Sequence, residues 1–335
     1  MKAIFLVKDK AKVRKVYSEE LINKLEFSEP LIEYTKEEIV TNSRKFAAVK
    51  YIFSTWYMPV FNENEIKEYF PALEAVFYAA GTVKYFAEPF MKCGVKVFSS
   101  AKANGIPVAE FTAAQIVLAN KGYFQAQKEC KKPFFKLAFN KARRIVYSKN
   151  GNYHACIGLI GAGAVGSKVI ELLKPYDLGI YVYDPYISDE RANELCVTKM
   201  NLEELFSACD VISNHLPDVE STRGILNYSL FSRMKPAATF INTGRGAQVV
   251  EKDLIKALRE APQRCALLDV TSHEPLWPWS PLNWQRNVFI TPHIAGSVSQ
   301  EEQRMAEYMF RAYDDLRKGK SSPYEVTWEM LDKMA

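Results

Sequence analysis

Short apolar runs alternate with helix-like segments over most of the chain. In the first part of the chain the apolar runs lie at 3–7, 49–53, 75–78 and 95–98. The segments between them include a charged helix that follows the first strand and runs through Leu25, and helices at 63–70 and 83–92. Such alternation is typical of a parallel sheet with helices on its faces. This region has no glycine-rich phosphate loop, so we do not expect it to bind a nucleotide.

The same alternation returns between residue 154 and about residue 291. The six strand candidates of this region lie at 155–160, 179–183, 211–215, 239–242, 266–270 and 288–291. Six strands with intervening helices fit a doubly wound fold. The sequence therefore predicts an α/β protein with two doubly wound parallel-sheet domains.

Three further segments connect these regions or follow them. Residues 107–127 have helical spacing and a broad apolar face, which predicts a helix buried between domains or subunits. Residues 128–152 are polar and irregular, and we interpret them as a connector or a dimer arm. Residues 299–318 form an amphipathic helix that we expect to return to the first domain. The predicted domains are residues 1–104 with 298–335, and residues 105–297.

A glycine-rich turn follows the first strand of the second region. Gly161 permits a tight turn, Gly163 allows a pyrophosphate to approach the backbone, and Gly166 allows the next helix to pack closely on the strand. The next apolar run ends in Asp184, eighteen positions after Gly166. A carboxylate there accepts hydrogen bonds from adenosine ribose hydroxyls and repels a 2′-phosphate. The pattern predicts a dinucleotide site that favours NAD over NADP; a structural turn with a surface aspartate is the alternative.

The composition argues against nucleic-acid binding and against a membrane protein. The chain has 335 residues, a formal net charge of +5 and 25% charged residues, an ordinary globular composition that does not favour nucleic acid. The densest basic stretch, 128–149, is better explained as a solvated helix or a subunit contact than as an RNA surface. No apolar run reaches membrane length, and the apolar start is too short for a signal segment. We expect no nucleic acid and no membrane as partners.

The six cysteines show no paired C-x-x-C spacing. Cys156 and Cys265 lie inside apolar strand-like runs, where they look like buried small hydrophobic residues. We therefore expect no metal site and a reduced, cytoplasmic compartment.

Reactive residues follow the strands of the second region. The third strand ends at His215-Leu216-Pro217, and the fourth is followed by Arg245 in Asn242-Thr243-Gly244-Arg245-Gly246. Asp269 closes the fifth strand with Glu274 just beyond, and His293 and Gly296 follow the sixth. Open parallel sheets bind ligands beyond the carboxyl ends of their strands. The sequence therefore predicts a guanidinium, a carboxylate and an imidazole on one rim with the cofactor.

Each of these three groups suits one task. Arg245 offers a planar fork that can hold a carboxylate through two hydrogen bonds. His293 can exchange a proton near neutral pH, and Glu274 against its other ring nitrogen would fix the tautomer and favour imidazolium. Taken singly, each residue has an ordinary structural explanation. Arg245 could be a surface or phosphate-contact arginine, Glu274 could start a helix before Pro275, and His293 could be a loop histidine. Together beside a nicotinamide they predict alcohol–ketone redox chemistry on an α-substituted acid.

These segments resemble the D-isomer-specific 2-hydroxyacid dehydrogenases, the family of phosphoglycerate, glyoxylate/hydroxypyruvate and D-lactate dehydrogenases. The resemblance runs from about Gly81 to Gly296 and rests on the glycine turn, Tyr183-Asp184-Pro185, His215-Leu216-Pro217 with Thr222-Arg223-Gly224, residues 241–246, residues 268–275 and residues 291–293. It implies a Rossmann NAD-binding domain, a flavodoxin-like substrate domain and a cleft between them. It also implies a homodimer built through the helix after Val108-Ala109-Glu110.

The resemblance also implies roles for individual residues. The catalytic set is Arg245 as the binder of the substrate carboxylate, Glu274 and His293. The expected cofactor-binding residues are Gly161, Gly163, Ala164, Val165, Gly166, Asp184, His215, Leu216, Pro217, Thr222, Asn242, Thr243, Gly244, Asp269 and Gly296. The expected substrate-binding residues are Ala80, Gly81, Asn104, Arg245 and His293, with backbone N–H groups near Ala80-Gly81 reaching the substrate carboxylate from the first domain.

The chain departs from the family pattern near the expected substrate. Ser99-Ser100-Ala101-Lys102 stands where Asn-Thr-Pro-Gly is frequent, Asn120 where an arginine is usual, and Thr82-Val83-Lys84 where an aspartate is common. Lys84 and Lys102 are compatible with a phosphorylated or dicarboxylic substrate, and solvated loop lysines are the alternative.

The leading interpretation is an NAD-dependent enzyme that interconverts a D-2-hydroxy acid and its 2-keto acid. Formate dehydrogenases resemble the chain but pair glutamine with the histidine, and Glu274 argues against that activity. Phosphite dehydrogenase-like chemistry shares the arginine, glutamate and histidine and stays open. So does an NAD-sensing corepressor-like binding protein, because such chains retain the same three residues.

Overall fold

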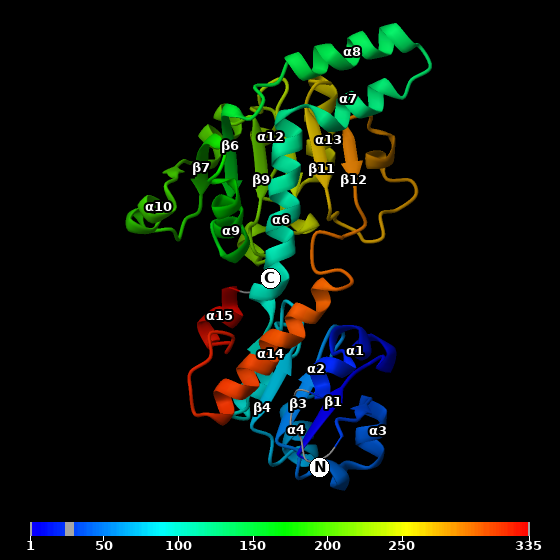
Figure 1. Cartoon of the computed structure of the whole chain (residues 1–335), viewed down its shortest axis with the longest axis vertical. Helices are drawn as coiled ribbons and strands as arrows, with labels where there is room; N and C mark the ends of the chain where they lie inside the picture. The colour runs from blue at the N-terminus through cyan, green and yellow to red at the C-terminus, as the bar shows by residue number, and fades with distance from the viewer. Residues whose placement is uncertain (1, 24–29, 334–335) are drawn as a thin grey trace. The chain divides into compact units, whose positions relative to one another are not determined.

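The computed structural model describes residues 2–23 and 30–333. The chain divides into two compact units, which we call unit 1 (Met1–Gly105 and Ser297–Ala335) and unit 2 (Ile106–Gly296). Each unit contains one parallel β-sheet (Figure 1). The predicted pair of parallel α/β sheets is therefore confirmed.

Unit 1 has a five-stranded sheet in the order β2-β1-β3-β4-β5, with every neighbouring pair parallel. The strands are β1 (Ala3–Leu6), β2 (Glu33–Tyr34), β3 (Tyr51–Ser54), β4 (Ala75–Tyr78) and β5 (Lys96–Ser99). The helices are α1 (Lys10–Val16), α2 (Glu19–Asn23), α3 (Lys36–Thr41), α4 (Glu63–Tyr69), α5 (Ala87–Lys92), α14 (Glu301–Arg317), α15 (Trp328–Lys333) and the start of α6 (Ala101–Asn120). This strand order is the flavodoxin-like one.

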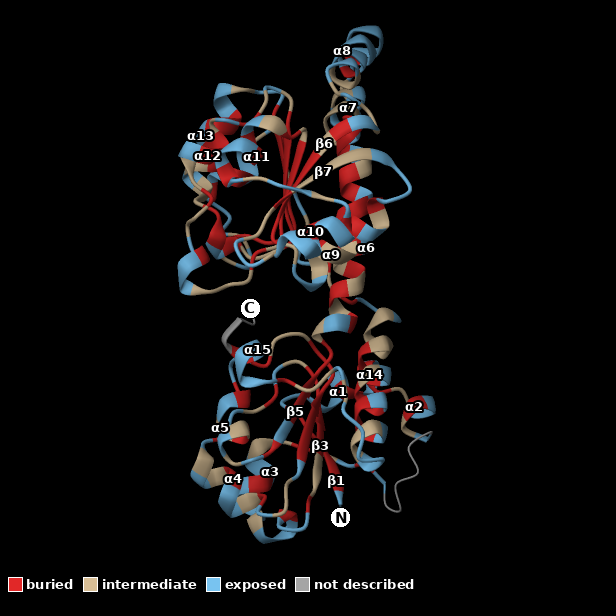
Figure 2. Ribbon diagram, turned by 90° about the vertical axis from the view of Figure 1, so that its left-hand side faces the viewer, coloured by how far each residue is buried: buried red, intermediate tan, exposed pale blue. Residues whose placement is uncertain are grey.

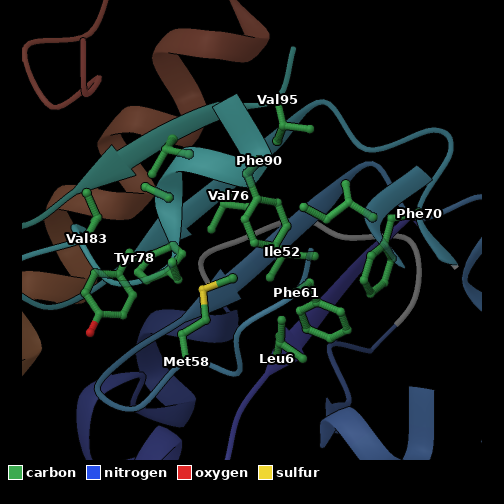
Figure 3. Packing of buried hydrophobic residues seen from close by; sticks show 14 of the residues in the cluster. Leu6, Ile52, Met58, Phe61, Phe70, Val76, Tyr78, Val83, Phe90 and Val95 are labelled. Carbon is green, nitrogen blue, oxygen red and sulfur yellow. The ribbon is translucent and has the colours of Figure 1, made fainter. Parts of the chain in front are cut away.

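Alternate side chains of the unit 1 strands enter two different cores. On one face, Phe53, Phe77 and Phe98 stack with centroid separations of 4.9 Å and are covered by α1 and α14. On the other face, residues such as Leu6, Ile52 and Val76 pack against the aromatic side chains that Figure 3 shows. A strand buried on both faces carries an almost continuous apolar run, which is why these strands were visible in the sequence.

We predicted one charged helix that runs through Leu25, and this prediction is wrong. The structure has two helices, α1 and α2, with the break at Tyr17, whose backbone leaves helical geometry. The Tyr17 side chain is fully buried, and its hydroxyl donates a 3.0 Å hydrogen bond to the carbonyl of Ser54. This tertiary contact ends the first helix, and Ser18 then caps the second through the N–H of Leu21. Leu25 itself lies outside the described residues.

Unit 2 has a seven-stranded parallel sheet in the order β12-β11-β10-β9-β6-β7-β8. The strands are β6 (Tyr153–Ile160), β7 (Asp177–Tyr183), β8 (Thr198–Lys199), β9 (Val211–Asn214), β10 (Thr239–Asn242), β11 (Cys265–Leu268) and β12 (Val288–Ile290). The helices are the remainder of α6, α7 (Tyr123–Cys130), α8 (Phe135–Tyr147), α9 (Ala164–Leu173), α10 (Asp189–Leu195), α11 (Leu202–Ala208), α12 (Tyr228–Phe231) and α13 (Glu251–Glu260). Six of the strands coincide with the predicted ones, and the two-residue edge strand β8 is additional.

Helices cover both faces of the unit 2 sheet. One face packs against α11, α12 and α13, and the other packs against α6, α9 and α10. Figure 2 shows the strands buried between these two layers. The order of the central strands, with β6 next to both β7 and β9, is that of a Rossmann fold, which reverses its winding between β6 and β9.

The segment between the two regions differs from the prediction. The helix expected at 107–127 begins earlier, at Ala101, and ends at Asn120, because Gly122 has a φ of +66° and starts a new helix, α7. The stretch predicted to be irregular, 128–152, contains the helix α8. Its buried side chains are Ala138 and Ala142, so the helix packs through two small residues that give almost no apolar signal in the sequence.

Three further findings concern the described part of the chain. None of its helices combines the length and the apolar character that a bilayer-spanning segment needs. No group of three or more His, Cys, Asp and Glu side chains there is placed to hold a metal ion. All six cysteines are free thiols, and Cys265 is buried whereas Cys156 is half-buried.

Candidate functional site

The loops after the strands of unit 2 carry most of the predicted site residues. The loop after β6 contains the glycine turn, and the loop after β7 begins at Asp184. The loops after β10, β11 and β12 contain Arg245, Glu274 and His293. In a parallel sheet these loops share one edge, so the fold gathers the residues on a single rim.

The glycine turn has no room for side chains at two of its positions. Gly161 has a φ of +95°, and a Cβ there would lie 3.0 Å from the carbonyl oxygen of His215. A Cβ on Gly166 would lie 2.1 Å from the carbonyl oxygen of Gly161. A Cβ on Gly163 would meet nothing within 4 Å, and α9 begins at the next residue, Ala164. The start of the helix is therefore open, with free N–H groups and a favourable dipole, and it fits the diphosphate of a dinucleotide.

Asp184 is fixed against the glycine turn. Its Oδ2 accepts a 2.8 Å hydrogen bond from the N–H of Ala162, and its Oδ1 accepts a 2.9 Å bond from the N–H of Tyr186. Each carboxylate oxygen has a further lone pair. The carboxylate can therefore accept ribose hydroxyls while it stays anchored to the turn.

The loop after β9 is held largely by its own hydrogen bonds. Thr222 donates from Oγ1 to the carbonyl of Pro217 at 2.6 Å, and Leu216 is buried. The Nε2 of His215 lies 3.0 Å from the hydroxyl of Ser213. Burial lowers the pKa of His215 to about 4, and its buried Nδ1 has no hydrogen-bond partner in the described part of the chain. His215 is therefore a neutral imidazole beside the glycine turn.

Two buried amides join the loops after β9 and β10, and sequence reasoning missed both. Asn214 donates to Asn242 Oδ1 at 3.0 Å and to Gln248 Oε1. Gln248 donates to the carbonyls of Leu216 and Pro217 at 2.7 and 2.8 Å. Asn and Gln side chains give no periodic signal, and only the fold shows that these amides are buried and paired.

Asn242, Thr243 and Gly244 form the turn that carries Arg245. The amide of Asn242 accepts the N–H of Gly244 at 3.1 Å and donates to the carbonyl of Arg245 at 3.1 Å. The hydroxyl of Thr243 lies 3.0 Å from that of Thr112 on α6. The turn is thus tied to the strand before it and to a helix that packs on the sheet.

Arg245 makes no ion pair within residues 2–23 and 30–333. Its Nη1 donates to the carbonyl of Gly244 at 2.8 Å, which leaves the remaining guanidinium donors available. A Cβ on Gly246 would lie 1.9 Å from the carbonyl oxygen of Thr271. The loops after β10 and β11 are therefore in contact, and Arg245 lies next to the loop that contains Glu274.

A buried carboxylate holds the segment that contains His293. Asp269 is 3% exposed. Its Oδ1 accepts Thr291 Oγ1 at 2.6 Å and the N–H of Ile294 at 2.9 Å, and its Oδ2 accepts the N–H of Ala295 at 2.9 Å. Asp269, predicted to contact the cofactor, thus also fixes the backbone on both sides of His293.

Glu274 and His293 form the pair that the sequence predicted. Glu274 Oε2 lies 2.7 Å from His293 Nδ1, and its Oε1 accepts the N–H of Thr271 at 3.3 Å. His293 has a φ of +55°, a conformation that the bonds of Asp269 hold in place. With Nδ1 engaged by the carboxylate, Nε2 is the ring nitrogen available for proton exchange.

The predicted substrate residues of the first region lie in unit 1. The N–H of Ala80 donates to the carbonyl of Tyr78 at 2.9 Å. The N–H of Gly81 has no acceptor in the described part of the chain, so it is the one available to a ligand. The carbonyl of Gly81 accepts Ser99 Oγ at 2.6 Å. Asn104 Nδ2 lies 3.6 Å from the position of a Cβ on Gly81, so unit 1 brings these residues together.

Three residues at which the chain departs from the family pattern have different surroundings in the structure. Lys102 donates to the carbonyl of Pro323 at 3.0 Å, and Lys84 is exposed. Asn120 is buried and donates to Asn152 Oδ1 at 3.0 Å. Gly296, the last predicted cofactor residue, is the last residue of unit 2.

Comparison with known proteins identifies similar sequences. Residues 114–295 match the model of the D-isomer specific 2-hydroxyacid dehydrogenase, NAD binding domain. A glyoxylate reductase from Korarchaeum cryptofilum is 29% identical over 80% of this chain and 80% of its own length. A D-3-phosphoglycerate dehydrogenase from Synechocystis sp. is 32% identical over 64% of this chain, but only 37% of that relative's own length is matched.

Solved structures share the fold. A D-mandelate dehydrogenase from Rhodotorula graminis superposes with a TM-score of 0.80 at 20% identity, over 97% of each chain. An NAD-complexed D-isomer specific 2-hydroxyacid dehydrogenase from Lactobacillus delbrueckii ssp. bulgaricus has a TM-score of 0.77 at 20% identity, over 97% of this chain and 100% of that chain.

The geometry of Asp184 predicts the choice of coenzyme. We expect the wild-type chain to bind NADH at least about tenfold more tightly than NADPH, because the anchored carboxylate repels a 2′-phosphate. Asp184→Ser should remove most of this preference, which fluorescence titration with each coenzyme measures. Asp189→Ser, which changes an exposed carboxylate at the start of α10, is the matched control. Equal affinities of the wild-type chain for both coenzymes would contradict the role of Asp184.

Proposed function

Because the chain belongs to the family of D-isomer specific 2-hydroxyacid dehydrogenases, we propose that it interconverts a D-2-hydroxy acid and its 2-keto acid. Members of this family are NAD-dependent oxidoreductases, and the chain has the family's NAD-binding domain. The observation that supports the proposal best is the 2.7 Å contact between Glu274 and His293, on the same rim as Arg245, which makes no ion pair with any residue that the structure describes.

The residues around the glycine turn fit the coenzyme. The open start of α9 would hold the diphosphate, and Asp184 would hold the adenosine ribose. Bound NAD would supply the group that accepts or donates hydride at the substrate C2. Thr243 and Asp269, on the loops after β10 and β11, would help to position it.

Arg245 would bind the substrate carboxylate. A guanidinium presents two parallel N–H groups that match the two oxygens of a carboxylate. Because Arg245 has no acidic partner within the described residues, binding does not require an existing ion pair to break. Bidentate binding would also fix the orientation of C2, which follows the carboxylate directly in a 2-hydroxy acid.

His293 would act as the general base in oxidation and as the general acid in reduction. Its Nε2 would take the proton from the C2 hydroxyl group and return it to the carbonyl oxygen in the reverse direction. Glu274 would keep the proton of the neutral ring on Nδ1 and stabilise the imidazolium that forms. The exposed fractions of the two side chains, 49% for His293 and 40% for Glu274, leave them accessible to a substrate.

We further propose that the chain forms a homodimer through α6 and α8. Glu110, Ala114 and Leu118 are exposed four residues apart on α6, so they form one stripe along the helix. The segment at α8 exposes a group of large apolar side chains: Phe134, Phe135, Leu137, Phe139 and Tyr147. Several large apolar side chains that are exposed on one short segment are typical of a protein contact. The six free thiols support the further proposal that the protein works in the reducing cytoplasm.

Removal of the imidazole tests the catalytic proposal. We expect His293→Ala to lower kcat/KM by about 10²–10⁴-fold with little change in NADH affinity, because the general acid is lost and the coenzyme site is kept. The assay is NADH oxidation with glyoxylate, hydroxypyruvate, pyruvate, bulky 2-keto acids and phosphorylated ones, with phosphite oxidation by NAD as a separate arm. His154→Ala, which changes an exposed histidine, is the control. Undiminished turnover in His293→Ala would refute the acid/base role.

Replacement of the guanidinium tests substrate binding. We expect Arg245→Lys to raise KM for the 2-keto acid by about tenfold or more, since an ammonium keeps the charge but cannot form the bidentate pair. Steady-state kinetics give KM, and NADH titration checks that coenzyme binding is preserved. Arg286→Lys changes an exposed arginine in the same unit and should leave KM unchanged. An unchanged KM in Arg245→Lys would reject the assignment.

A charged residue at the apolar contact tests the dimer. Leu137 is 73% exposed in the structure, so Leu137→Glu should spare the fold and weaken the dimer by about thirtyfold or more, the effect of a central interface residue. Sedimentation equilibrium measures the dissociation constant. Val40→Glu, at a 47% exposed position of α3, should not change it. A wild-type chain that is monomeric at micromolar concentration would exclude the proposed dimer.

A further inference from the structure

A cavity of about 340 Å³ lies in unit 2 at the amino ends of β9, β10 and β11. It is therefore at the opposite edge of the sheet from the glycine turn and Arg245. Its walls come from the end of α6, the segment after α8 and the residues that lead into the three strands. This volume is within the range of small-molecule sites.

One lysine in the wall has no carboxylate partner. Lys149 donates from Nζ to the carbonyl of Ala237 and, at 3.4 Å, to Thr239 Oγ1. Both partners are neutral, and no ion pair of Lys149 occurs within residues 2–23 and 30–333. An ammonium has three N–H donors, so one is left for a ligand. Burial lowers the pKa of Lys149, and the nearby Cys265 and Asp210 oppose this shift only in part.

The acidic group in the wall is already compensated. Asp210 Oδ1 accepts Lys235 Nζ at 2.8 Å, and its Oδ2 accepts the N–H of Cys156 at 2.8 Å. The wall thus contains two ammonium groups and one carboxylate, which leaves one positive charge in excess. That charge is the one on Lys149, because Lys235 is paired.

Neutral donors complete the wall. Asn150 and Gln263 line the cavity at exposed positions, and their side-chain amides form no hydrogen bonds in the part of the chain that the structure describes. Their N–H groups are therefore available to an acceptor. A half-buried cation, an excess positive charge and uncommitted amide donors together match a small oxyanion, whose oxygens accept several hydrogen bonds at once.

We propose that this cavity is a second binding site of the protein, specific for a small oxyanion that carries phosphate or carboxylate groups and is held by Lys149. The aliphatic stem of Lys149 also packs near Gly122, since a Cβ on Gly122 would lie 3.3 Å from Lys149 Cγ. Gly122 precedes α7, and Lys149 follows α8. A bound oxyanion would therefore fix the two ends of the α7–α8 segment through one side chain.

The test is a titration of the full chain with inorganic phosphate, and in a second arm with malonate, by isothermal calorimetry. NADH is present at saturation so that the diphosphate turn is occupied, and potassium chloride keeps the ionic strength constant. We expect saturable binding of at least one of the two probes. Lys149→Met should weaken that binding at least about tenfold, and Lys149→Arg should retain it within about threefold.

Two further variants serve as a control and as a second test of the cavity. Lys174→Met removes an exposed lysine of the same unit and should bind the probe like wild type. Gln263→Glu adds a carboxylate at an exposed position of the wall, so it should weaken binding even if Lys149→Met fails to fold. Absence of saturable binding of both probes, or wild-type affinity in Gln263→Glu and in a folded Lys149→Met, would overturn the proposal. The readout is independent of keto-acid reduction, so failure of the proposed function would not affect it.

Discussion

The candidate site depends on the buried carboxylate of Asp269. A carboxylate that is 3% exposed is costly to bury unless its oxygens are bonded. Here the donors are Thr291, Ile294 and Ala295, all from the segment that follows β12. Hydrogen bonds to a charged group contribute about 1.5–3 kcal/mol each, enough to hold His293 at its positive φ. These bonds therefore stabilise the backbone conformation from which the imidazole of His293 reaches Glu274.

Groups other than the guanidinium also hold the loop of Arg245, which makes no ion pair within the described residues. Its loop is held by other groups: the amides of Asn214, Asn242 and Gln248 bond its turn, and Gly246 lies against the carbonyl of Thr271. An arginine that used all its guanidinium donors to anchor its own loop would have to give up those bonds to bind a substrate, whereas Arg245 uses one, on the carbonyl of Gly244. Because neutral amides position the backbone, the guanidinium is left with uncommitted donors, which is what the proposed binding of a carboxylate requires.

The sequence predicted the central strands and the rim because both have local signals. Buried parallel strands are continuous apolar runs, and residues after such strands share one edge of the sheet, so the meeting of Glu274 with His293 followed from topology. The sequence did not predict the break at Tyr17, because a tertiary hydrogen bond of the Tyr17 hydroxyl sets it. It did not predict the helix α8, because the buried residues of that helix are two small alanines. Gln248 was missed because nothing beside it in the sequence shows that it is buried. The catalytic and cofactor roles of the rim residues stay predictions.

The two edges of the unit 2 sheet expose different backbone groups, N–H groups at one edge and carbonyl groups at the other. At the carboxyl edge, α9 begins and offers free N–H groups, so an anion can bind there without a cation. At the amino edge, helices such as α13 end, and their last carbonyl groups need donors. Arg264 supplies them, with bonds to the carbonyls of Ala257 and Ser232, and it is 7% exposed. Lys149 is a second cation at this edge, and it donates to the carbonyl of Ala237 and the hydroxyl of Thr239 in the wall of a cavity. Because both of these oxygens are neutral, the positive charge of Lys149 is the group that would attract an anion to this edge.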